Sequence, residues 1–161
     1  MDELAETKAP AYSHTQKAPL CLVLYGSAMA MFVGVWLTYG EYPITLILGG
    51  VGIGMIFLAP AFHHLAVVDQ GEFLAIRFGP LPLFRRKVRY ANIMKAEVGR
   101  TLLLDGWGIH YSIRGGWVWN LWGRDCVVVQ FRNGGVLRIG TDDAGNLARF
   151  LEGKIGQKQP A

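Results

Sequence analysis

Residues 20–65 read "LCLVLYGSAMAMFVGVWLTYGEYPITLILGGVGIGMIFLAPAFHHL" and decide the architecture of the chain. Residues 20–39 form one run without Asp, Glu, Lys or Arg, and residues 44–65 form a second. A helix of about 20 residues spans roughly 30 Å, the thickness of the hydrocarbon core of a bilayer. The linker "GEYP" (40–43) allows only a tight antiparallel turn. We therefore predict a two-helix transmembrane hairpin over residues 19–65, not a cleaved signal peptide, whose apolar core is shorter.

The composition and the charge distribution agree with a membrane hairpin. Hydrophobic residues make up 52% of the chain and charged residues only 17%, whereas about a quarter is typical of soluble domains. All Lys and Arg lie outside the short loop, which carries only Glu41. The positive-inside rule then places both termini in the cytoplasm. Trp36, Tyr39 and Tyr42 are expected at the outer interface, where amphipathic rings accumulate.

Small residues recur at every fourth position in both apolar runs. Gly26, Ala30 and Gly34 form a stripe in the first run, and Gly50 and Gly54 form one in the second. Such stripes allow helix backbones to approach closely. We predict that the two stripes face each other within one chain. Dimerisation of two chains through one stripe is the alternative, because the same pattern serves both contacts.

The end of the second run contains a proline and two histidines. Pro60 is predicted to kink or end the helix near its cytoplasmic side. His63 and His64 raise the possibility of haem or metal binding, but the first run contains no histidine, and His14 and His110 have no ligand-like spacing with the pair. We therefore expect interfacial histidines, with no metal and no cofactor.

After residue 65 the sequence changes to short segments bounded by Gly, Pro and Asn. Strands are predicted at residues 72–79, 85–90, 93–100, 108–113, 117–120, 126–131 and 136–140. The Asn-Gly at 133–134 is a strong hairpin signal between the last two. Residues 141–155, "TDDAGNLARFLEGKI", have apolar residues at helical spacing and predict a helix that covers the sheet structure. We predict one cytoplasmic β-rich domain over residues 66–156, a flexible cytoplasmic tail over 1–18 and a disordered tail over 157–161.

Two segments carry a resemblance to a known family. They are "FGPLPLFRRKVRYANI" (78–93) and "GRDCVVVQFRNGGVLRIGTDDAGNLARFL" (123–151), together with the pattern of Asn120, Gly123 and Asp125. These segments resemble bacterial membrane-anchored proteins with a pleckstrin-homology-like (PH-like) domain of uncharacterised function. The resemblance implies a PH-like barrel of about seven antiparallel strands capped by a C-terminal helix, a location in the bacterial inner membrane and a non-enzymatic module. A dense Lys/Arg loop of the phosphoinositide-binding kind is absent between the first strands, so specific phosphoinositide recognition is not implied.

The sequence offers little for catalysis. Gly-x-Ser-x-Gly, His-Glu-x-x-His and Cys-x-x-Cys motifs are absent, and "GGVGIG" (49–54) lacks the Lys and Ser/Thr of a phosphate loop. Cys126 follows an Arg-Asp pair, and a neighbouring cation can activate a thiol. However, Cys126 begins an apolar strand, and a cysteine nucleophile needs a positioned base. We expect a protein that is not an enzyme, with Cys21 and Cys126 as buried thiols.

The basic run at residues 85–89 is one candidate binding site. Residues 66–161 carry 14 Lys and Arg against 8 Asp and Glu. On a strand Arg85, Lys87 and Arg89 share one face and Arg86 lies on the other. The exposed cations could contact anionic lipid headgroups at about 1 kcal/mol each. Alternatively, they protect a strand edge against pairing with another chain. The cations match no nucleic-acid-binding motif, so we expect no nucleic acid partner.

The tryptophans form the second candidate. Trp117 and Trp119 share a strand face, and packing inside the domain is the favoured interpretation of such rings. A partner-binding patch is the alternative, with Trp119 and Trp122 as the candidates, because aromatic residues are enriched at contact hot spots.

Together these features predict a non-catalytic adaptor, assembly or regulatory subunit at the cytoplasmic face of the membrane, with membrane lipids and either a protein partner or a second copy as its contacts. A peripheral sensor of anionic lipid and an accessory subunit of a membrane enzyme or transporter complex are the alternatives. A transporter acting alone is disfavoured, because the spans contain no acid, Lys or Arg.

Overall fold

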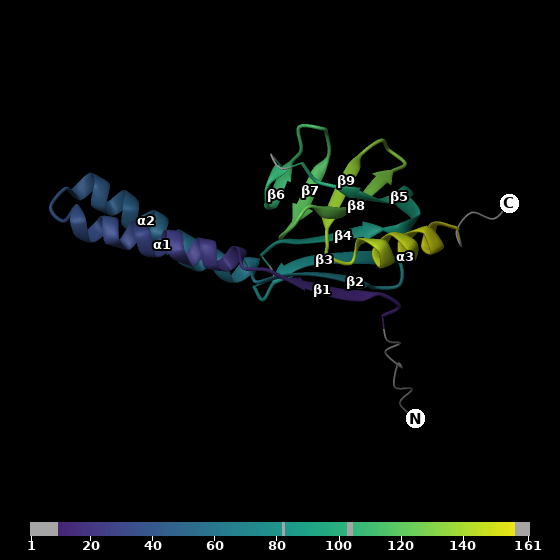
Figure 1. Ribbon diagram of the computed structural model, residues 1–161, viewed down its shortest axis with the longest axis horizontal. Coiled ribbons are helices and arrows are strands. Elements are labelled where there is room, and N and C mark those ends of the chain that lie inside the picture. Colours follow the sequence, from purple (N-terminus) through teal and green to yellow (C-terminus); the bar gives the residue numbers. More distant parts are fainter. Residues whose placement is uncertain (1–9, 82, 103–104, 157–161) are drawn as a thin grey trace, which may run out of the picture.

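The computed structural model describes residues 10–81, 83–102 and 105–156 (Figure 1). A long helical hairpin projects from one end of a β-rich domain. Its helices are α1 (Leu20–Leu37) and α2 (Tyr42–Leu58), and the 3₁₀ helix η1 (Ala59–Phe62) follows α2. The α-helix therefore ends at Leu58 and not at residue 65 as predicted. Pro60 accounts for this end, because it lacks an amide hydrogen and its ring disfavours a continuous helix.

The two helices pack through small residues, but of the predicted stripe residues only Gly34 lies at the contact. Ala28 of α1 and Gly52 of α2 are buried between the helices. A methyl group added at Gly52 would lie 3.2 Å from the ring of Phe32. A four-residue period shows that a small-residue stripe exists, but it does not show which face of the helix packs against the neighbour.

The predicted stripe residues therefore lie mostly away from the contact between the two helices. Gly34 lies against Leu48, with 3.0 Å between an added methyl group and the Leu48 Cδ1 atom. The remaining members of the two stripes are exposed on the outside of the hairpin, and these are Gly26, Ala30, Gly50 and Gly54.

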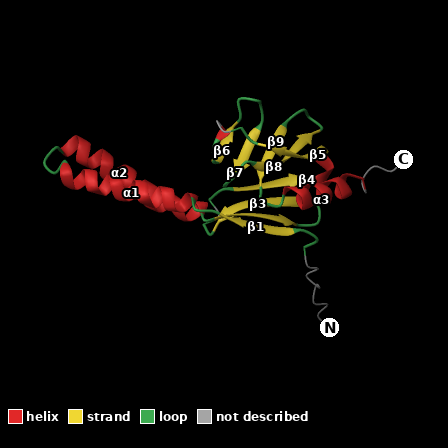
Figure 2. Cartoon of the chain, in the orientation of Figure 1, coloured by secondary structure: helices red, strands yellow, loops and turns green. Residues whose placement is uncertain are grey.

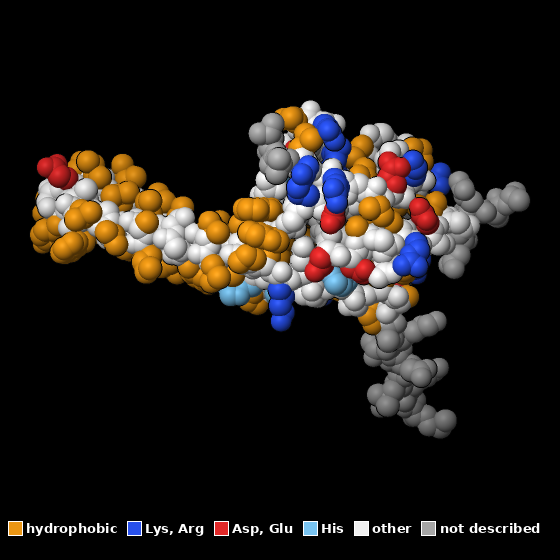
Figure 3. All heavy atoms as spheres, in the orientation of Figure 1, with side chains coloured by type: hydrophobic (Ala, Val, Ile, Leu, Met, Phe, Trp, Pro, Cys, Tyr) orange, Lys and Arg blue, Asp and Glu red, His pale blue; other side chains and the backbone are white. Residues whose placement is uncertain are grey.

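The outer surface of the hairpin is apolar. Residues Leu20–Leu37 and Tyr42–Phe62 have mean hydropathies of 2.0 and 2.1, and only 11% and 17% of these segments is buried. Large side chains such as Leu22 (65% exposed) and Phe57 (66% exposed) point outward. Figure 3 shows hydrophobic side chains along most of this surface, with acidic atoms only near the hairpin tip on the side in view. By length and composition, both helices can cross a membrane.

A strand precedes the hairpin, in a region predicted to be a flexible tail. β1 (Ser13–Lys17) pairs antiparallel with β2 (His64–Asp69), the strand that follows the hairpin, and Lys17 lies opposite His64. The hairpin is thus an insertion between two neighbouring strands, and the β domain begins before it. The sequence pattern does not reveal β1, because this short strand is mostly polar and buries only Gln16. Residues 1–9 of the predicted tail lie outside the described residues, as does the predicted tail at 157–161.

The first sheet contains four antiparallel strands in the order β1-β2-β3-β4. β3 (Phe73–Gly79) and β4 (Arg85–Arg89) lie close to their predicted positions. β1 and β4 are the edge strands. In Figure 1 the strands of this sheet run roughly along the long axis of the molecule, in the direction of the hairpin.

The second sheet contains five strands in the order β5-β8-β9-β7-β6. Its strands are β5 (Ile93–Arg100), β6 (Gly108–Tyr111), β7 (Trp117–Asn120), β8 (Asp125–Phe131) and β9 (Val136–Gly140). The predicted Asn-Gly hairpin between β8 and β9 is confirmed by their antiparallel pairing. In contrast, β7 pairs with β9 in parallel, so the all-antiparallel prediction is wrong at this point.

The two sheets and the helix α3 (Ala144–Gly156) enclose one core (Figure 2). α3 buries Leu147 and Leu151 against side chains from both sheets. The predicted C-terminal helix and the general β-rich architecture are therefore confirmed. The strands form two separate sheets and not the closed barrel that we expected, because the described strands of one sheet do not pair with those of the other.

Candidate anion-binding groove

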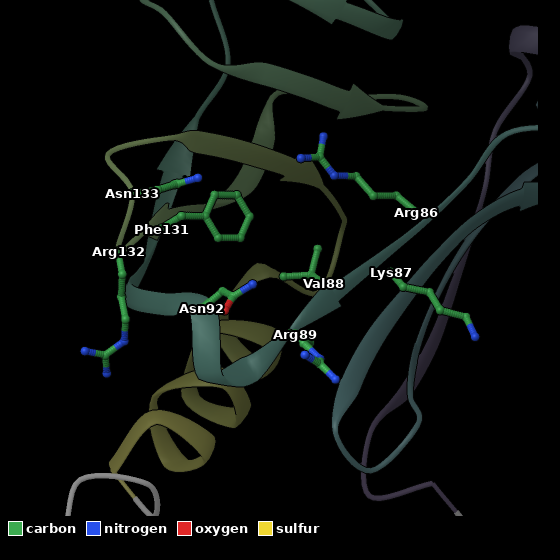
Figure 4. Close-up of a pocket in the computed structure, with 8 residues that line it drawn as sticks. All are labelled: Arg86, Lys87, Val88, Arg89, Asn92, Phe131, Arg132 and Asn133. Atoms are coloured by element: carbon green, nitrogen blue, oxygen red, sulfur yellow. The ribbon is translucent and has the colours of Figure 1, made fainter.

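A groove lies between the edge strand β4 and the β8–β9 turn. Its volume is about 450 Å³. One wall comes from β4 and the short 3₁₀ helix η2 (Tyr90–Asn92), and the other comes from the end of β8 and the turn that follows it (Figure 4). The lining residues are Arg86, Lys87, Val88, Arg89, Asn92, Phe131, Arg132 and Asn133.

The alternation of β4 sets the positions of the cations in this groove. Val88 is buried in the core and anchors the strand. The predicted alternation is confirmed, because Arg85, Lys87 and Arg89 are exposed and Arg86 is half-buried on the inner face of β4. In Figure 4, Arg86 extends toward the β8–β9 side of the groove, whereas Lys87 points away from it. The groove therefore has one inner cation, with further cations along its outer rim.

Arg86 is the most enclosed of these cations. Burial lowers the pKa of the Arg86 guanidinium from its usual value, yet arginine remains protonated in proteins. A half-buried guanidinium without a carboxylate partner is costly, because burial removes its hydration. A bound anion would restore that stabilisation through paired hydrogen bonds.

Hydrogen bonds between side chains and the backbone, and one between backbone groups, hold the opposite wall in place. The Arg132 amide donates to the Asn92 carbonyl (2.9 Å), and the Arg132 Nε atom donates to the Ala91 carbonyl (3.0 Å). The Asn133 side chain accepts a hydrogen bond from the amide of Gly135 (3.1 Å) and shapes the turn. These bonds connect η2 to the β8–β9 turn, so residues about forty positions apart in sequence form one site.

The groove carries positive charge without compensating acid. Within residues 10–81, 83–102 and 105–156, no carboxylate lies within 4.0 Å of the basic groups of Arg86, Lys87, Arg89 or Arg132. Lys87 and Arg89 instead lie near the Phe73 ring, at 6.0 and 5.2 Å from its centroid. Like charges that line one groove in this way raise the local concentration of anions. The groove is therefore suited to carboxylates or phosphates, which arginine binds through two hydrogen bonds.

A neighbouring cavity extends the groove toward the β6–β7 turn. It has a volume of about 510 Å³ and shares Arg86, Phe131 and Asn133 with the groove. Arg114 and Trp117 line its far side. The two cavities adjoin each other at Arg86 and Phe131.

The tryptophans of the β domain differ in how deeply they are buried. Trp119 is only 8% exposed and packs near Phe78, with 5.9 Å between the ring centroids, so it belongs to the core and not to a binding surface. Trp122 is half-buried and stacks on Trp107 at 4.2 Å. Within the β domain, Trp107 and Trp117 are exposed, at 48% and 45%. The alternation in the segment shows that Trp117 and Trp119 share a face, but not how far each lies from the core.

Sequence reasoning found the β4 cations but not the opposite wall. Asn92, Phe131, Arg132 and Asn133 were not among the predicted site residues. The sequence does mark Arg132 and Asn133 as part of a hairpin turn, which is a signal for structure and not for binding. Their part in a site depends on the packing of that turn against η2.

The histidines and cysteines show no arrangement for metal binding or catalysis in the described parts of the chain. His63 hydrogen-bonds the Tyr25 hydroxyl (3.3 Å), whereas His64 lies in β2 opposite Gly79. Among the described residues, no group of three or more His, Cys, Asp or Glu side chains could hold a metal ion. Burial raises the pKa of the Cys126 thiol to about 11, so the thiol stays protonated at neutral pH.

Comparisons with known proteins add no identification. No family model matches the chain, and no curated protein and no solved structure matches it significantly.

Proposed function

We propose that this chain is a membrane-anchored, non-catalytic adaptor at the cytoplasmic face of the bacterial inner membrane. In this proposal its PH-like domain binds an acidic segment of a protein partner in the groove between β4 and the β8–β9 turn. The observation that carries the proposal is a groove lined by four cations, with Arg86 inside and Lys87, Arg89 and Arg132 on its rim (Figure 4), without a nearby carboxylate in the described part of the chain.

The hairpin supports membrane anchoring. Exposed side chains of this size and apolarity are unfavourable in water, at about 25 cal/mol for each Å² of apolar surface. Trp36 and Tyr39 lie at the loop end of the hairpin, where rings favour the membrane interface. The sequence has no Lys or Arg in the loop, and all of them precede or follow the hairpin, which favours cytoplasmic termini.

The order of the elements supports a PH-like domain. A four-stranded antiparallel sheet is followed by a second sheet and then by a C-terminal helix that packs on β5 and β8. Two features depart from the expected pattern: the parallel pairing of β7 with β9, and the insertion of the hairpin after β1. The first departure lies inside the second sheet, the second lies at the β1 edge of the first sheet, and neither involves β5 or β8, on which the final helix packs.

The position of the groove favours a protein segment over the headgroups of the anchoring membrane. Arg85 pairs with Arg77 at the end of the first sheet from which the hairpin emerges, and Arg89 pairs with Phe73 at the other end. Four residues of strand extend about 13 Å. Arg89 and the adjoining Arg132 wall therefore lie more than one Debye length, about 8 Å, beyond Arg85. An acidic segment of a cytoplasmic protein can reach the Arg89 and Arg132 end of this groove without contact with the bilayer.

The proposal is tested with the full chain in nanodiscs of neutral lipid and a fluorescent peptide rich in Glu and Asp. We expect salt-sensitive binding, measured by fluorescence anisotropy. The triple variant Arg86→Gln/Arg89→Gln/Arg132→Gln should weaken binding at least tenfold, or about 1.4 kcal/mol. Arg149→Gln is the matched control, because Arg149 is an exposed cation on α3 outside the groove.

Two results would contradict the proposal. Equal peptide binding by the wild type and the triple variant would exclude the groove as the site. Absence of peptide binding, together with capture of anionic vesicles that depends on the same three arginines, would favour the lipid-sensor alternative.

A further inference from the structure

Most of the exposed large hydrophobic side chains of the β domain gather on the side that faces the hairpin. Outside the hairpin these residues are Leu81, Leu83, Met94, Val98, Trp107, Tyr111, Ile113 and Trp117 in the described part of the chain. Met94 and Val98 belong to β5, at the far edge of the second sheet. The others come from two places, the β3–β4 loop and the region of β6 and β7.

The β3–β4 loop lies beside the point where the hairpin leaves the domain. Gly79, at the start of this loop, pairs with His64, which in turn pairs with Lys17. The ring of Phe62 in η1 packs against Phe78 and Phe84 at the base of the loop, with centroids 5.4 and 5.7 Å apart. Leu81 and Leu83 extend beyond this base and are 38% and 47% exposed. These leucines therefore lie next to the apolar surface of the hairpin.

The β6 edge faces the same direction. β6 is the edge strand of the second sheet, and along the long axis of the molecule it is the strand of that sheet closest to the hairpin (Figure 1). Tyr111 and Ile113 at its end are 65% and 77% exposed, and Trp107 before it is 48% exposed. Figure 3 shows hydrophobic side chains that continue from the hairpin onto the adjoining edge of the domain. An apolar edge of this kind is unusual in water, where exposed edges are normally protected by charge.

Cations surround these apolar residues. Lys17, Arg77, Arg85 and Arg114 are exposed. Arg77 and Arg85 lie directly opposite each other on β3 and β4, and like charges in that position destabilise a sheet. Within the described residues, no carboxylate lies within 4.0 Å of either guanidinium to offset the repulsion. An anionic surface in contact with this end of the sheet would offset it.

We infer that the hairpin-facing surface docks on the anionic cytoplasmic leaflet of the membrane that the hairpin spans. This surface is formed by the apolar residues Leu81, Leu83, Trp107, Tyr111 and Ile113 and by the cations Lys17, Arg77, Arg85 and Arg114. This inference rests on the membrane anchoring proposed above. Aromatic and apolar side chains favour the interfacial region of a bilayer, and the cations favour anionic headgroups. The hairpin holds the surface at the bilayer, so docking requires no further loss of translational freedom.

Spin labels on the full chain in nanodiscs that contain phosphatidylglycerol test the inference. Labels at Ile113→Cys and Leu83→Cys report the surface, and a label at Val98→Cys is the control, since Val98 is an apolar residue of the far edge strand and 59% exposed. A label at Ile47→Cys in the hairpin reports anchoring separately. The wild type serves as the labelling blank, because its two free cysteines are buried.

We expect the ratio of collisions with oxygen to collisions with a water-soluble nickel complex to be several-fold higher at positions 113 and 83 than at position 98. The pair Arg77→Gln/Arg85→Gln should lower the ratio at 113, and replacement of the anionic lipid by neutral lipid should lower it as well.

A ratio at 113 and 83 equal to that at 98, with a high ratio at 47, would overturn docking while anchoring stands, and would leave this surface for a protein partner. A low ratio at 47 would overturn anchoring itself. A ratio at 113 that responds neither to lipid charge nor to the arginine pair would overturn the part assigned to the anionic lipid.

Discussion

Replacement of Asp69 by asparagine tests how α3 is held to the first sheet. The Asp69 side chain, only 6% exposed, accepts hydrogen bonds from the Tyr90 hydroxyl (2.7 Å) and the Gly71 amide (3.0 Å). The Nζ atom of Lys154 in α3 lies 3.5 Å from its second oxygen. Burial raises the pKa of Asp69, but these hydrogen bonds and Lys154 outweigh burial and leave the pKa below its ordinary value of 3.8. The carboxylate is therefore stabilised by the folded state.

The magnitude follows from the change in the bonds that Asp69 accepts. A hydrogen bond to a charged acceptor contributes about 1 kcal/mol more than one to a neutral acceptor, and Asp69→Asn changes two of them. Loss of the attraction to Lys154, a quarter exposed, adds up to about 1 kcal/mol. We expect Asp69→Asn to lower the free energy of unfolding by about 2–3 kcal/mol at pH 7. Lys154→Met, which keeps apolar contact with Tyr90 and Phe150, should cost about 1–2 kcal/mol through loss of the ion pair and the cation–π contacts.

The assay is urea unfolding of the full chain in detergent, followed by tryptophan fluorescence, with a double-mutant cycle. The double variant should lose about 1 kcal/mol less than the sum of the two single variants, because both remove the same ion pair. Since the folded pKa of Asp69 is lowered, its contribution is complete above the unfolded pKa and is lost as the pH falls through the folded pKa. The deficit of Asp69→Asn should therefore be constant from pH 7 to about pH 5 and shrink below about pH 4. Additive single variants, or a deficit that does not change with pH, would refute this reasoning.

Three further substitutions test other parts of the fold. Gly52→Leu should separate the hairpin helices, lower the free energy of unfolding by about 1–3 kcal/mol and so lower the melting temperature in detergent. Gly50→Leu should have no such effect, because Gly50 faces open space. Equal melting temperatures of the two variants would contradict the packing. Tyr12→Ala should destabilise the domain by about 2 kcal/mol in urea unfolding, because Tyr12 stacks on the Phe150 ring of α3 and its hydroxyl donates to Asp143, just before α3. A free energy of unfolding equal to that of the wild type would mean that the segment before the hairpin contributes nothing. Gly140→Ala should lower the free energy of unfolding by about 3 kcal/mol or more in thermal unfolding, because the new methyl group would lie 2.8 Å from the Cα atom of Asn120. A variant as stable as the wild type would show that β7 and β9 can separate.

The basic groove shows where prediction from the sequence stops. The alternation of β4 is enough to place Arg86 on the inner face and Arg89 on the outer face, because a strand has a fixed period of two. The opposite wall depends on hydrogen bonds of Arg132 to Ala91 and Asn92, and no local pattern links these segments. Trp119 is a second example of this limit. The alternation of β7 identifies the face on which Trp119 lies, but its burial depends on packing against Phe78 in the other sheet.

The sequence by itself determined the features that depend on neighbouring residues: two apolar helices with a tight turn, the seven strands after β2, the Asn-Gly hairpin and the amphipathic helix α3. Apolar runs, period-two alternation and turn residues act within a few positions, so they can be read directly. Only the tertiary structure decided that β1 pairs with β2 across the whole hairpin, which helix faces meet, and that β7 lies parallel to β9. These choices depend on which distant surfaces bury the most apolar area together, and a short polar strand such as β1 carries no mark of its partner.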